Sequence, residues 1–244
     1  MKVCILENDD LHPAAASTYQ GYAAMFVRLF RAAGANWEFE VFHTPTQQYP
    51  DSFATYDVVV LTGSKADAFS EQPWVVELRK QVTALLAQRK KLLGVCFGHQ
   101  LIALCLGAKV GRSPNGWGVG RMVYDWRGSA LAKGWQDGPL SMLVSHQDQV
   151  LELPAGAQLL ASNAHCPIAA YAVGEHVFCV QGHPEFVEDY SAFLLAQRKH
   201  LLGEDLVARA TDSLQHGHDG LQVAQMMVAF AQRVPGCASN SERP

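Results

Sequence analysis

Short apolar runs that alternate with helical patterns constrain the fold of the first half of the chain. The run YDVVVL at residues 56–61 is dominated by β-branched residues, a pattern typical of a strand covered on both faces. Residues 14–33 and 73–89 carry apolar side chains at helical spacing; Gly34 ends the first pattern and Pro73 opens the second. Further strand-like runs lie at residues 2–6, 37–42 and 92–95. This order predicts an α/β fold, with an open and mostly parallel sheet flanked by helices.

The pattern changes between residues 108 and 180. The segments there are short, strand-like and separated by turn residues, which predicts a short antiparallel addition before the chain returns to the main sheet. Helical patterns resume after residue 186, and the polar segment 238–244 is expected to be a disordered tail. Because no internal repeat or low-complexity linker interrupts the chain, we expect a single domain over residues 1–237.

Composition and charge exclude several classes of protein. The net charge is −4 and the basic residues cluster only at residues 89–91, so no basic face for nucleic acid is expected. No apolar run approaches the length of a membrane span. The six cysteines show no paired spacing and lie mostly in apolar runs, which indicates free thiols in a cytoplasmic protein. We therefore expect neither nucleic acid nor a membrane as a partner.

The segment KLLGVCFGHQ, residues 91–100, carries the first chemical signal. Gly94 and Gly98 flank Cys96 where a strand pattern changes into a helical one, which predicts a sharp strand-to-helix turn that presents a nucleophile. The N-terminus of the helix would favour the thiolate, and the N–H of Phe97 would point to where an oxyanion forms. The alternative is that Cys96 is a small buried residue after a strand, as most free cysteines are.

The segment VFCVQGHPE, residues 177–185, carries the second signal. It is a strand pattern that ends at Gly182, and it delivers His183 and Glu185 to the same carboxyl edge of the sheet as Cys96. A cysteine nucleophile needs a base, and the base needs an orienting acid; Glu185 fits that second role. Taken alone, His183 would be a polar loop residue and Glu185 a charge in the first turn of a helix. Their coincidence with Cys96 favours a Cys-His-Glu triad.

The motifs GVCFGHQ and QGHPE together resemble the class I, triad-type glutamine amidotransferase domain, and the resemblance extends over most of the chain. It implies a flavodoxin-like fold. It also implies that Cys96 attacks the γ-carbonyl of glutamine or of a γ-glutamyl amide, that His183 transfers the proton, and that Glu185 orients His183. The γ-glutamyl thioester formed in this way would be hydrolysed or aminolysed.

The resemblance assigns further residues of the site. It implies that Gly63, in the segment LTGSKADAF, and Phe97 supply the two N–H groups of an oxyanion hole. The segment SHQD at residues 145–148 falls where guanosine monophosphate synthetase carries a similar loop. The residues implied to bind substrate are Gln100, Ser145, His146 and Gln147.

The chain also departs from many members of this family. Its oxyanion loop reads Thr62-Gly63-Ser64-Lys65 in place of two glycines and a proline, which is closer to stand-alone members similar to the amidotransferase domain of guanosine monophosphate synthetase. No segment after residue 190 is long enough to bind ATP or an acceptor, so ammonia transfer would need a synthetase or acceptor domain in another chain. The C-terminal helical stretches are expected to cap the site or to contact a partner; they span residues 187–202, 205–215 and 221–232.

Other candidate sites are weaker. The pair His165 and Cys166 lacks the second ligand pair of a zinc site, and the segment GWGVG at residues 116–120 lacks the helix and lysine of a phosphate loop. We expect neither a metal nor a cofactor, and we interpret GWGVG as a flexible turn beside the cleft. The acidic segment at residues 7–10 is interpreted as a solvated loop, with contact to a substrate amine as the alternative.

Three functions remain open from the sequence. The first is a self-contained hydrolase of glutamine or γ-glutamyl compounds, favoured by the missing synthetase portion. The second is a subunit that supplies ammonia to a partner chain. The third is a binding module with a relic site, which the presence of all three triad residues disfavours.

Overall fold

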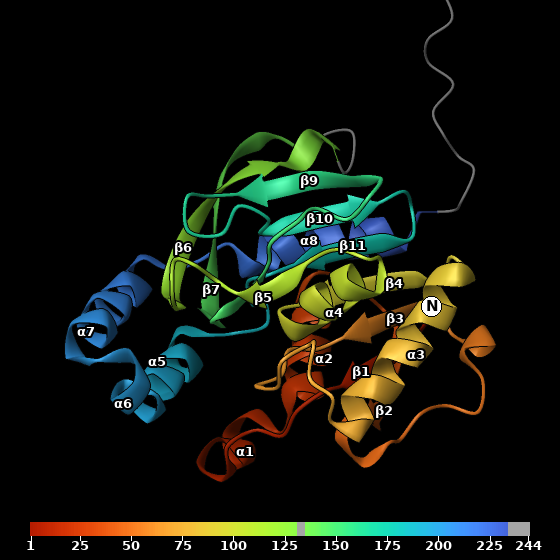
Figure 1. The fold of residues 1–244 in the computed structure, drawn as a ribbon, viewed down its shortest axis with the longest axis horizontal. Helices are drawn as coiled ribbons and strands as arrows, with labels where there is room; N and C mark the ends of the chain where they lie inside the picture. Colours follow the sequence, from red (N-terminus) through yellow and green to blue (C-terminus); the bar gives the residue numbers. More distant parts are fainter. Residues whose placement is uncertain (131–134, 234–244) are drawn as a thin grey trace, which may run out of the picture.

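The structure, a computed structural model, describes residues 1–130 and 135–233. Five parallel strands form one half of its main sheet: β1 (Lys2–Glu7), β2 (Glu38–His43), β3 (Val58–Leu61), β4 (Lys91–Val95) and β11 (Val177–Val180). Four antiparallel strands form the other half: β6 (Gly118–Arg127), β7 (Asp137–His146), β9 (Ala157–Ser162) and β10 (Ala170–Val173). Within the described residues the strand order is β2-β1-β3-β4-β11-β10-β9-β6-β7 (Figure 1). A small second sheet pairs β5 (Val110–Arg112) with β8 (Asp148–Val150).

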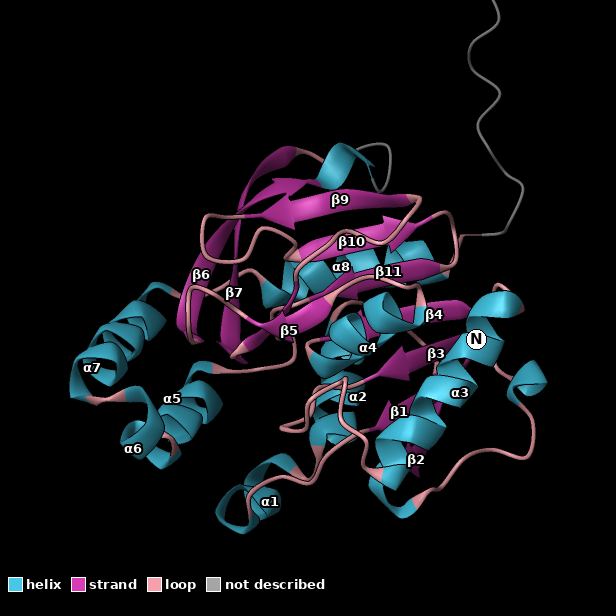
Figure 2. Cartoon of the chain, viewed as in Figure 1, coloured by secondary structure: helices cyan, strands magenta, loops and turns pink. Residues whose placement is uncertain are grey.

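Helices cover both faces of the parallel half. Helices α2 (Tyr22–Ala32) and α8 (Gly220–Ala231) pack on one face, and α3 (Pro73–Ala87) and α4 (Phe97–Cys105) pack on the other (Figure 2). Successive residues of a strand alternate between these two layers: Ile5 belongs to the first apolar cluster and Leu6 to the second. This double coverage explains why the parallel strands read as continuous apolar runs.

The helix predicted over residues 14–33 is interrupted. It consists of α1 (Pro13–Tyr19) and α2, separated by Gln20 and Gly21, whose φ angles are 66° and 120°. A carboxylate oxygen of Glu7 accepts a 2.8 Å hydrogen bond from the N–H of Ala23, in the first turn of α2. Because the helix breaks, α2 has free backbone N–H groups at its start, and the carboxylate of Glu7 accepts a hydrogen bond from one of them.

The C-terminal part adds a helical lobe beside β6 and β7 (Figure 1). It comprises α5 (Glu188–Gln197), α6 (Lys199–Leu202) and α7 (Glu204–Ser213). The helix predicted over residues 187–202 is therefore divided at Arg198, which has φ −98° and ψ 7°. Among the described residues, short 3₁₀ turns occur at η1 (Thr44–Thr46), η2 (Phe53–Thr55), η3 (Gly128–Ala130) and η4 (Leu214–His216).

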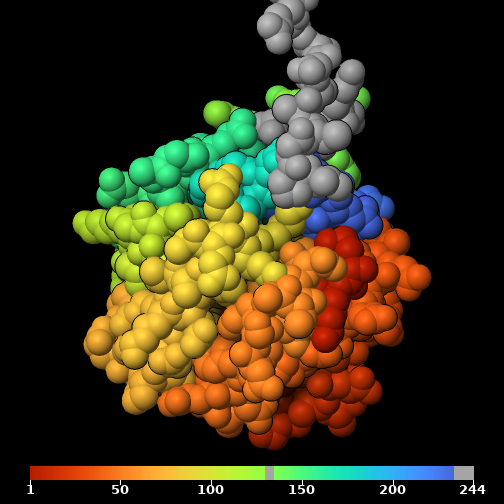
Figure 3. Space-filling view, turned by 90° about the vertical axis from the view of Figure 1, so that its right-hand side faces the viewer, coloured from red at the N-terminus to blue at the C-terminus, as the bar shows by residue number. Residues whose placement is uncertain are grey.

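Both ends of the described chain meet at the amino edge of the parallel strands. Met1 lines the same cavity as Ala231 and Arg233, and Figure 3 shows the red N-terminal residues beside the blue end of α8. None of the helices in residues 1–130 and 135–233 has the length and apolar character that a membrane crossing requires. Cys237 and the tail predicted at residues 238–244 lie outside the described residues.

Candidate active site

The predicted strand-to-helix turn is present at Cys96. Its φ of 51° and ψ of −102° lie in a region that non-glycine residues rarely adopt, at a cost of roughly 1–3 kcal/mol. A Cβ on Gly98 would lie 2.5 Å from the carbonyl oxygen of Leu61, and one on Gly94 would lie 2.9 Å from the backbone of Gly98. The two flanking glycines are thus required because strand and helix backbones approach closely here.

His183 and Glu185 follow β11 at the same edge of the sheet. The backbone N–H of His183 donates to the carbonyl of Leu143 at 2.8 Å, which ties this segment to β7. The imidazole Nδ1 lies 2.7 Å from Oε1 of Glu185, with the two side chains 5% and 0% exposed. Phe186 stacks on the imidazole at 3.9 Å between ring centroids. With Nδ1 bound to the carboxylate, Nε2 is left to exchange a proton with a reacting group.

The charges around His183 favour its protonated form. Burial alone would lower the pKa of His183, but the carboxylate of Glu185 and, to a lesser degree, the sulfur of Cys96 outweigh it through charge and hydrogen bonding and raise the pKa to about 10. At neutral pH the imidazole therefore carries a proton that it can give to a reacting group. Because this value exceeds the ordinary 6.5, the charged His183 stabilises the fold fully below pH 6.5, and this contribution is lost as the pH rises through about 10.

Glu185→Gln is expected to shift the alkaline limb of the pH profile. The neutral amide removes the charge that raises the pKa of His183, so kcat/KM should begin to fall at a pH at least about one unit lower than in the parent. Initial rates from pH 5 to about pH 11 would measure this shift, with thermal unfolding as a check on the fold. An unchanged alkaline limb would show that Glu185 does not control the protonation of His183.

Gly63 and the first N–H of α4 lie beside this pair. A Cβ added to Gly63 would lie 2.8 Å from Cε1 of His183 and 3.6 Å from Cβ of Cys96, so the loop after β3 contacts both groups. Phe97 is the first residue of α4, and its N–H therefore has no acceptor within the helix. Asn8 fixes the loop: its N–H and its side-chain amide each donate to Thr62 at 2.9 Å.

The acidic segment at residues 7–10 braces the same loop. A carboxylate oxygen of Asp9 accepts from the N–H of Lys65 at 2.7 Å, and the other pairs with Nζ of Lys65 at 2.8 Å. Asn8 and Asp9 are both buried. The interpretation of this segment as a solvated loop is therefore wrong for these two residues, and their side chains are already engaged by the protein.

A cavity of about 290 Å³ opens beside Cys96. The four residues proposed from the sequence to bind substrate all line it: Gln100, Ser145, His146 and Gln147. The structure thus brings together, beside Cys96, residues that lie far apart in the sequence.

Two of these residues also fix the wall of the cavity. The amide of Gln100 donates to the carbonyl of Asp148 at 2.8 Å and to the side chain of Gln181 at 3.1 Å. Nδ1 of His146 lies 3.2 Å from that same carbonyl. Burial, with a smaller contribution from His165, lowers the pKa of His146 to about 3, so its ring is neutral and is not a second base.

The other described cysteines are poor nucleophiles. Burial raises the pKa values of Cys4, Cys166 and Cys179 to about 12, and it also raises that of Cys105. These thiols stay protonated at neutral pH, whereas the thiolate is the reactive form. Cys96 is the described cysteine that combines a strained turn, a histidine and a cavity.

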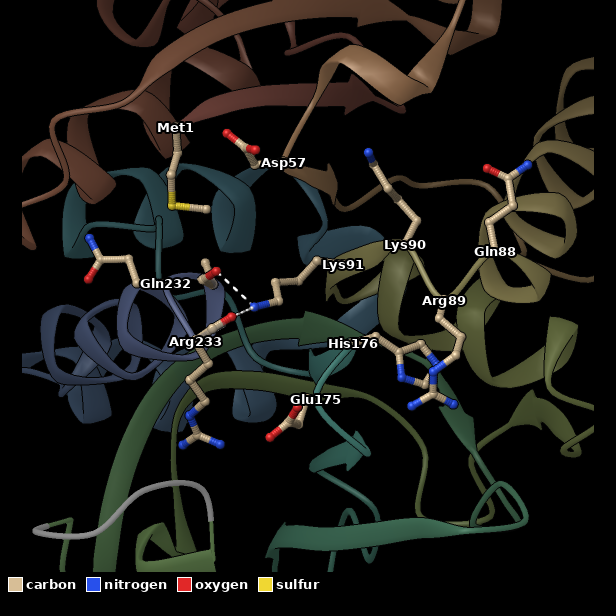
Figure 4. Close-up of a pocket in the computed structure, with 11 residues that line it drawn as sticks. Met1, Asp57, Gln88, Arg89, Lys90, Lys91, Glu175, His176, Gln232 and Arg233 are labelled. Atoms are coloured by element: carbon tan, nitrogen blue, oxygen red, sulfur yellow. Dashed lines mark hydrogen bonds between the residues drawn. The ribbon is translucent and has the colours of Figure 1, made fainter. Parts of the chain in front are cut away.

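A second cavity, of about 660 Å³, lies at the amino edge of the sheet (Figure 4). Lys91 points across it and donates to the carbonyls of Ala231, at 2.9 Å, and Arg233. No cysteine is among the described residues that line this cavity. At the amino edge, the side chain of Lys91 thus caps the last carbonyl groups of α8.

The described parts of the chain contain no set of side chains placed to bind a metal ion. Within residues 1–130 and 135–233, no group of three or more histidine, cysteine or acidic side chains is arranged to hold an ion. Cys166 is buried, and its backbone N–H donates to Oδ1 of Asn163 at 2.7 Å.

The sequence of residues 16–196 matches the family described as "Glutamine amidotransferase class-I". The chain belongs to this family. Gamma-glutamyl peptidase 3 of Arabidopsis thaliana is 38% identical over 177 residues, which cover 69% of this chain and 70% of the relative. The glutamine-hydrolyzing GMP synthase chain of Saccharolobus solfataricus is 29% identical over 187 residues, which cover 73% of this chain and 94% of the relative. A glutamine amidotransferase from Thermotoga maritima has the same fold, with a TM-score of 0.74 at 19% identity, covering 96% of this chain and 99% of the other.

Family membership confirms the resemblance and the fold class predicted from the sequence. The sequence placed GWGVG beside the cleft, but it gave no signal for Phe186 or Arg198. Phe186 stacks on His183, and Trp117 and Arg198 line the cavity beside Cys96. Trp117 lies in the GWGVG segment. The interpretation of this segment as a flexible turn is wrong for Gly118–Gly120, because these residues begin β6 and pair with β7.

Arg198 and Leu201 line the cavity, so the predicted stretch 187–202 lies beside the site. The predicted stretch 221–232 does not cap it, because α8 packs on the face of the parallel strands.

Proposed function

We propose that this class-I glutamine amidotransferase acts as a hydrolase of γ-glutamyl compounds, with Cys96, His183 and Glu185 as its catalytic triad. The observation that carries the proposal is the convergence of the strained Cys96 turn with the 2.7 Å pair of His183 and Glu185. The similarity to a gamma-glutamyl peptidase supports the choice of substrate class.

In the first half of the proposed reaction, the thiolate of Cys96 attacks the γ-carbonyl carbon and a C–S bond forms. The negative charge moves to the carbonyl oxygen, which the N–H groups of Gly63 and Phe97 stabilise. The C–N bond then breaks as His183 gives its proton to the amine, and the γ-glutamyl thioester remains.

In the second half, water replaces the departed amine. His183 takes a proton from the water while the hydroxide attacks the thioester carbonyl, and the same two N–H groups bind the oxyanion. The C–S bond breaks, glutamate leaves, and the thiolate and imidazolium are restored. Glu185 keeps Nδ1 protonated throughout and thereby fixes which nitrogen exchanges the proton.

A second candidate function is the supply of ammonia to a partner. It is favoured by the match to the GMP synthase chain of Saccharolobus solfataricus, which covers 94% of that protein. In this case the substrate is glutamine, and a synthetase chain would raise the rate of its hydrolysis.

Turnover of a small panel of compounds by the purified chain tests the proposal. We expect glutamate release from γ-glutamylglycine and little from α-glutamylglycine, because only the first places its reacting carbonyl and its free α-groups in the predicted positions. Discrimination at a site that binds such groups reaches roughly 10⁴-fold. If glutamate were released from glutamine but not from γ-glutamylglycine, and only after a synthetase was added, the result would contradict the hydrolase and support the ammonia-supplying role.

A further inference from the structure

The walls of the cavity beside Cys96 carry three cations, Lys65, Arg112 and Arg198. Two of them are neutralised by the protein. Lys65 pairs with Asp9 at 2.8 Å, and Arg112 pairs with Asp67 at 2.9 Å and with Asp148. For Arg198, no carboxylate of residues 1–130 or 135–233 lies within ion-pair distance. Its charge is thus available to an anion that enters the cleft.

Arg198 is held in place by neutral groups. One guanidinium nitrogen donates to Oγ of Ser145, and the guanidinium carbon lies 5.7 Å from the ring centroid of Trp117. A hydroxyl and an aromatic ring orient a guanidinium without cancelling its charge. The planar group also keeps further N–H donors for a second partner.

The position of Arg198 relates it to the departing amine. A small space of about 20 Å³, room for about one water molecule, is lined by both Cys96 and His183. Arg198, Tyr22 and Phe186 line the same space. Because the proposed role of His183 is to protonate the amine, the amine has to come close to this space, and Arg198 is one of the residues that a larger leaving group can contact there.

We propose that Arg198 binds a carboxylate on the amine side of the substrate, which makes γ-glutamyl amino acids or peptides better substrates than γ-glutamyl amides without that carboxylate. The inference rests on the proposed function and names its substrate class. A guanidinium and a carboxylate form paired, charge-assisted hydrogen bonds. The α-carboxylate of the glutamyl group offers the same chemistry, so an experiment has to separate the two carboxylates.

The test compares γ-glutamylglycine with γ-glutamylmethylamide, which lacks the amine-side carboxylate but keeps the α-carboxylate. Arg198→Gln should lower kcat/KM for γ-glutamylglycine about 10- to 100-fold, the usual effect of losing a hydrogen bond to a charged group. The rate with the methylamide should stay close to that of the parent. The kcat/KM of Arg198→Lys for γ-glutamylglycine should lie between those of the parent and Arg198→Gln, because lysine keeps the charge but cannot form the paired hydrogen bonds.

Lys199→Gln is the matched control. Lys199 is the next residue, 56% exposed, and pairs at 2.9 Å with Glu204 on the surface; it does not line either space beside Cys96. Its replacement removes the same charge from the same lobe and should leave the preference between the two compounds unchanged. Thermal unfolding of each variant checks the fold, and Arg198→Lys serves if Arg198→Gln does not fold.

Equal losses of kcat/KM with both compounds would assign Arg198 to the α-carboxylate and overturn the proposal. Parent-like kcat/KM with both compounds in Arg198→Gln would also overturn it. Calorimetric binding of both compounds to the Cys96→Ala protein separates this inference from the proposed function. If the parent turns over neither compound, the hydrolase proposal fails. The assignment of Arg198 is still supported if the Arg198→Gln, Cys96→Ala double variant binds γ-glutamylglycine more weakly than Cys96→Ala does and binds the methylamide equally well. Equal binding in that variant would contradict it.

Discussion

Replacing Cys96 by serine is expected to lower kcat/KM for γ-glutamylglycine by at least about 1,000-fold. A serine hydroxyl at this position lacks the ready ionisation of a thiol, and His183, already protonated at neutral pH, cannot take its proton. The backbone of the turn should be retained because serine has nearly the same shape as cysteine. Steady-state kinetics and a thermal unfolding curve would measure both expectations.

Cys105→Ser is the control for this prediction. Cys105 is partly buried at the end of α4, and burial raises the pKa of its thiol. Its replacement should leave the rate near that of the parent. Full activity in Cys96→Ser, or equal losses in the two variants, would remove the strand-to-helix turn from the mechanism.

Replacing His183 by glutamine is expected to cost roughly 1,000-fold in kcat, within the range of effects ascribed to general acid-base catalysis. Without the imidazole no group protonates the departing amine or activates the water. Glu185→Gln should cost less because the imidazole remains and only its orientation and charge are affected. Single-turnover rates on these variants would measure acylation and deacylation separately.

The combination of His183→Gln with Glu185→Gln tests whether the two residues act as a unit. Since the carboxylate acts through the imidazole, the double variant should be scarcely slower than His183→Gln alone. Multiplied losses would indicate that Glu185 has a role independent of His183. Parent-like activity in Glu185→Gln would instead reassign the orienting acid, with Glu188 and Asp189 as the nearest substitutes.

The parts of the site that were predictable from the sequence are those in which neighbouring residues determine the backbone. The glycines at 94 and 98 signalled the turn at Cys96 because close packing of strand and helix excludes a side chain at both positions. The order of apolar runs signalled the parallel strands, and with them the shared edge on which Cys96 and His183 lie.

The parts that were not predictable depend on contacts between distant segments. The break at Gln20 and Gly21 has no strong local signal, and it accompanies a bond from the α2 N-terminus to Glu7. The sequence suggested that Asp9 is a solvated surface acid, because its partner Lys65 is distant in the sequence and meets it only in the folded chain. Arg198 follows an ordinary helical pattern, and only the packing of the C-terminal lobe brings it to Ser145.

The most direct test of the central claim is the detection of an acyl group on Cys96. The protein is mixed with γ-glutamylglycine, quenched in acid within the first turnover, digested and examined by mass spectrometry. We predict that the peptide containing Cys96 gains the mass of one γ-glutamyl group, that hydroxylamine removes it, and that the His183→Gln protein gains it far more slowly. A γ-glutamyl group on another cysteine, or turnover of γ-glutamylglycine without any covalent adduct under these conditions, would contradict the assignment of Cys96 as the nucleophile.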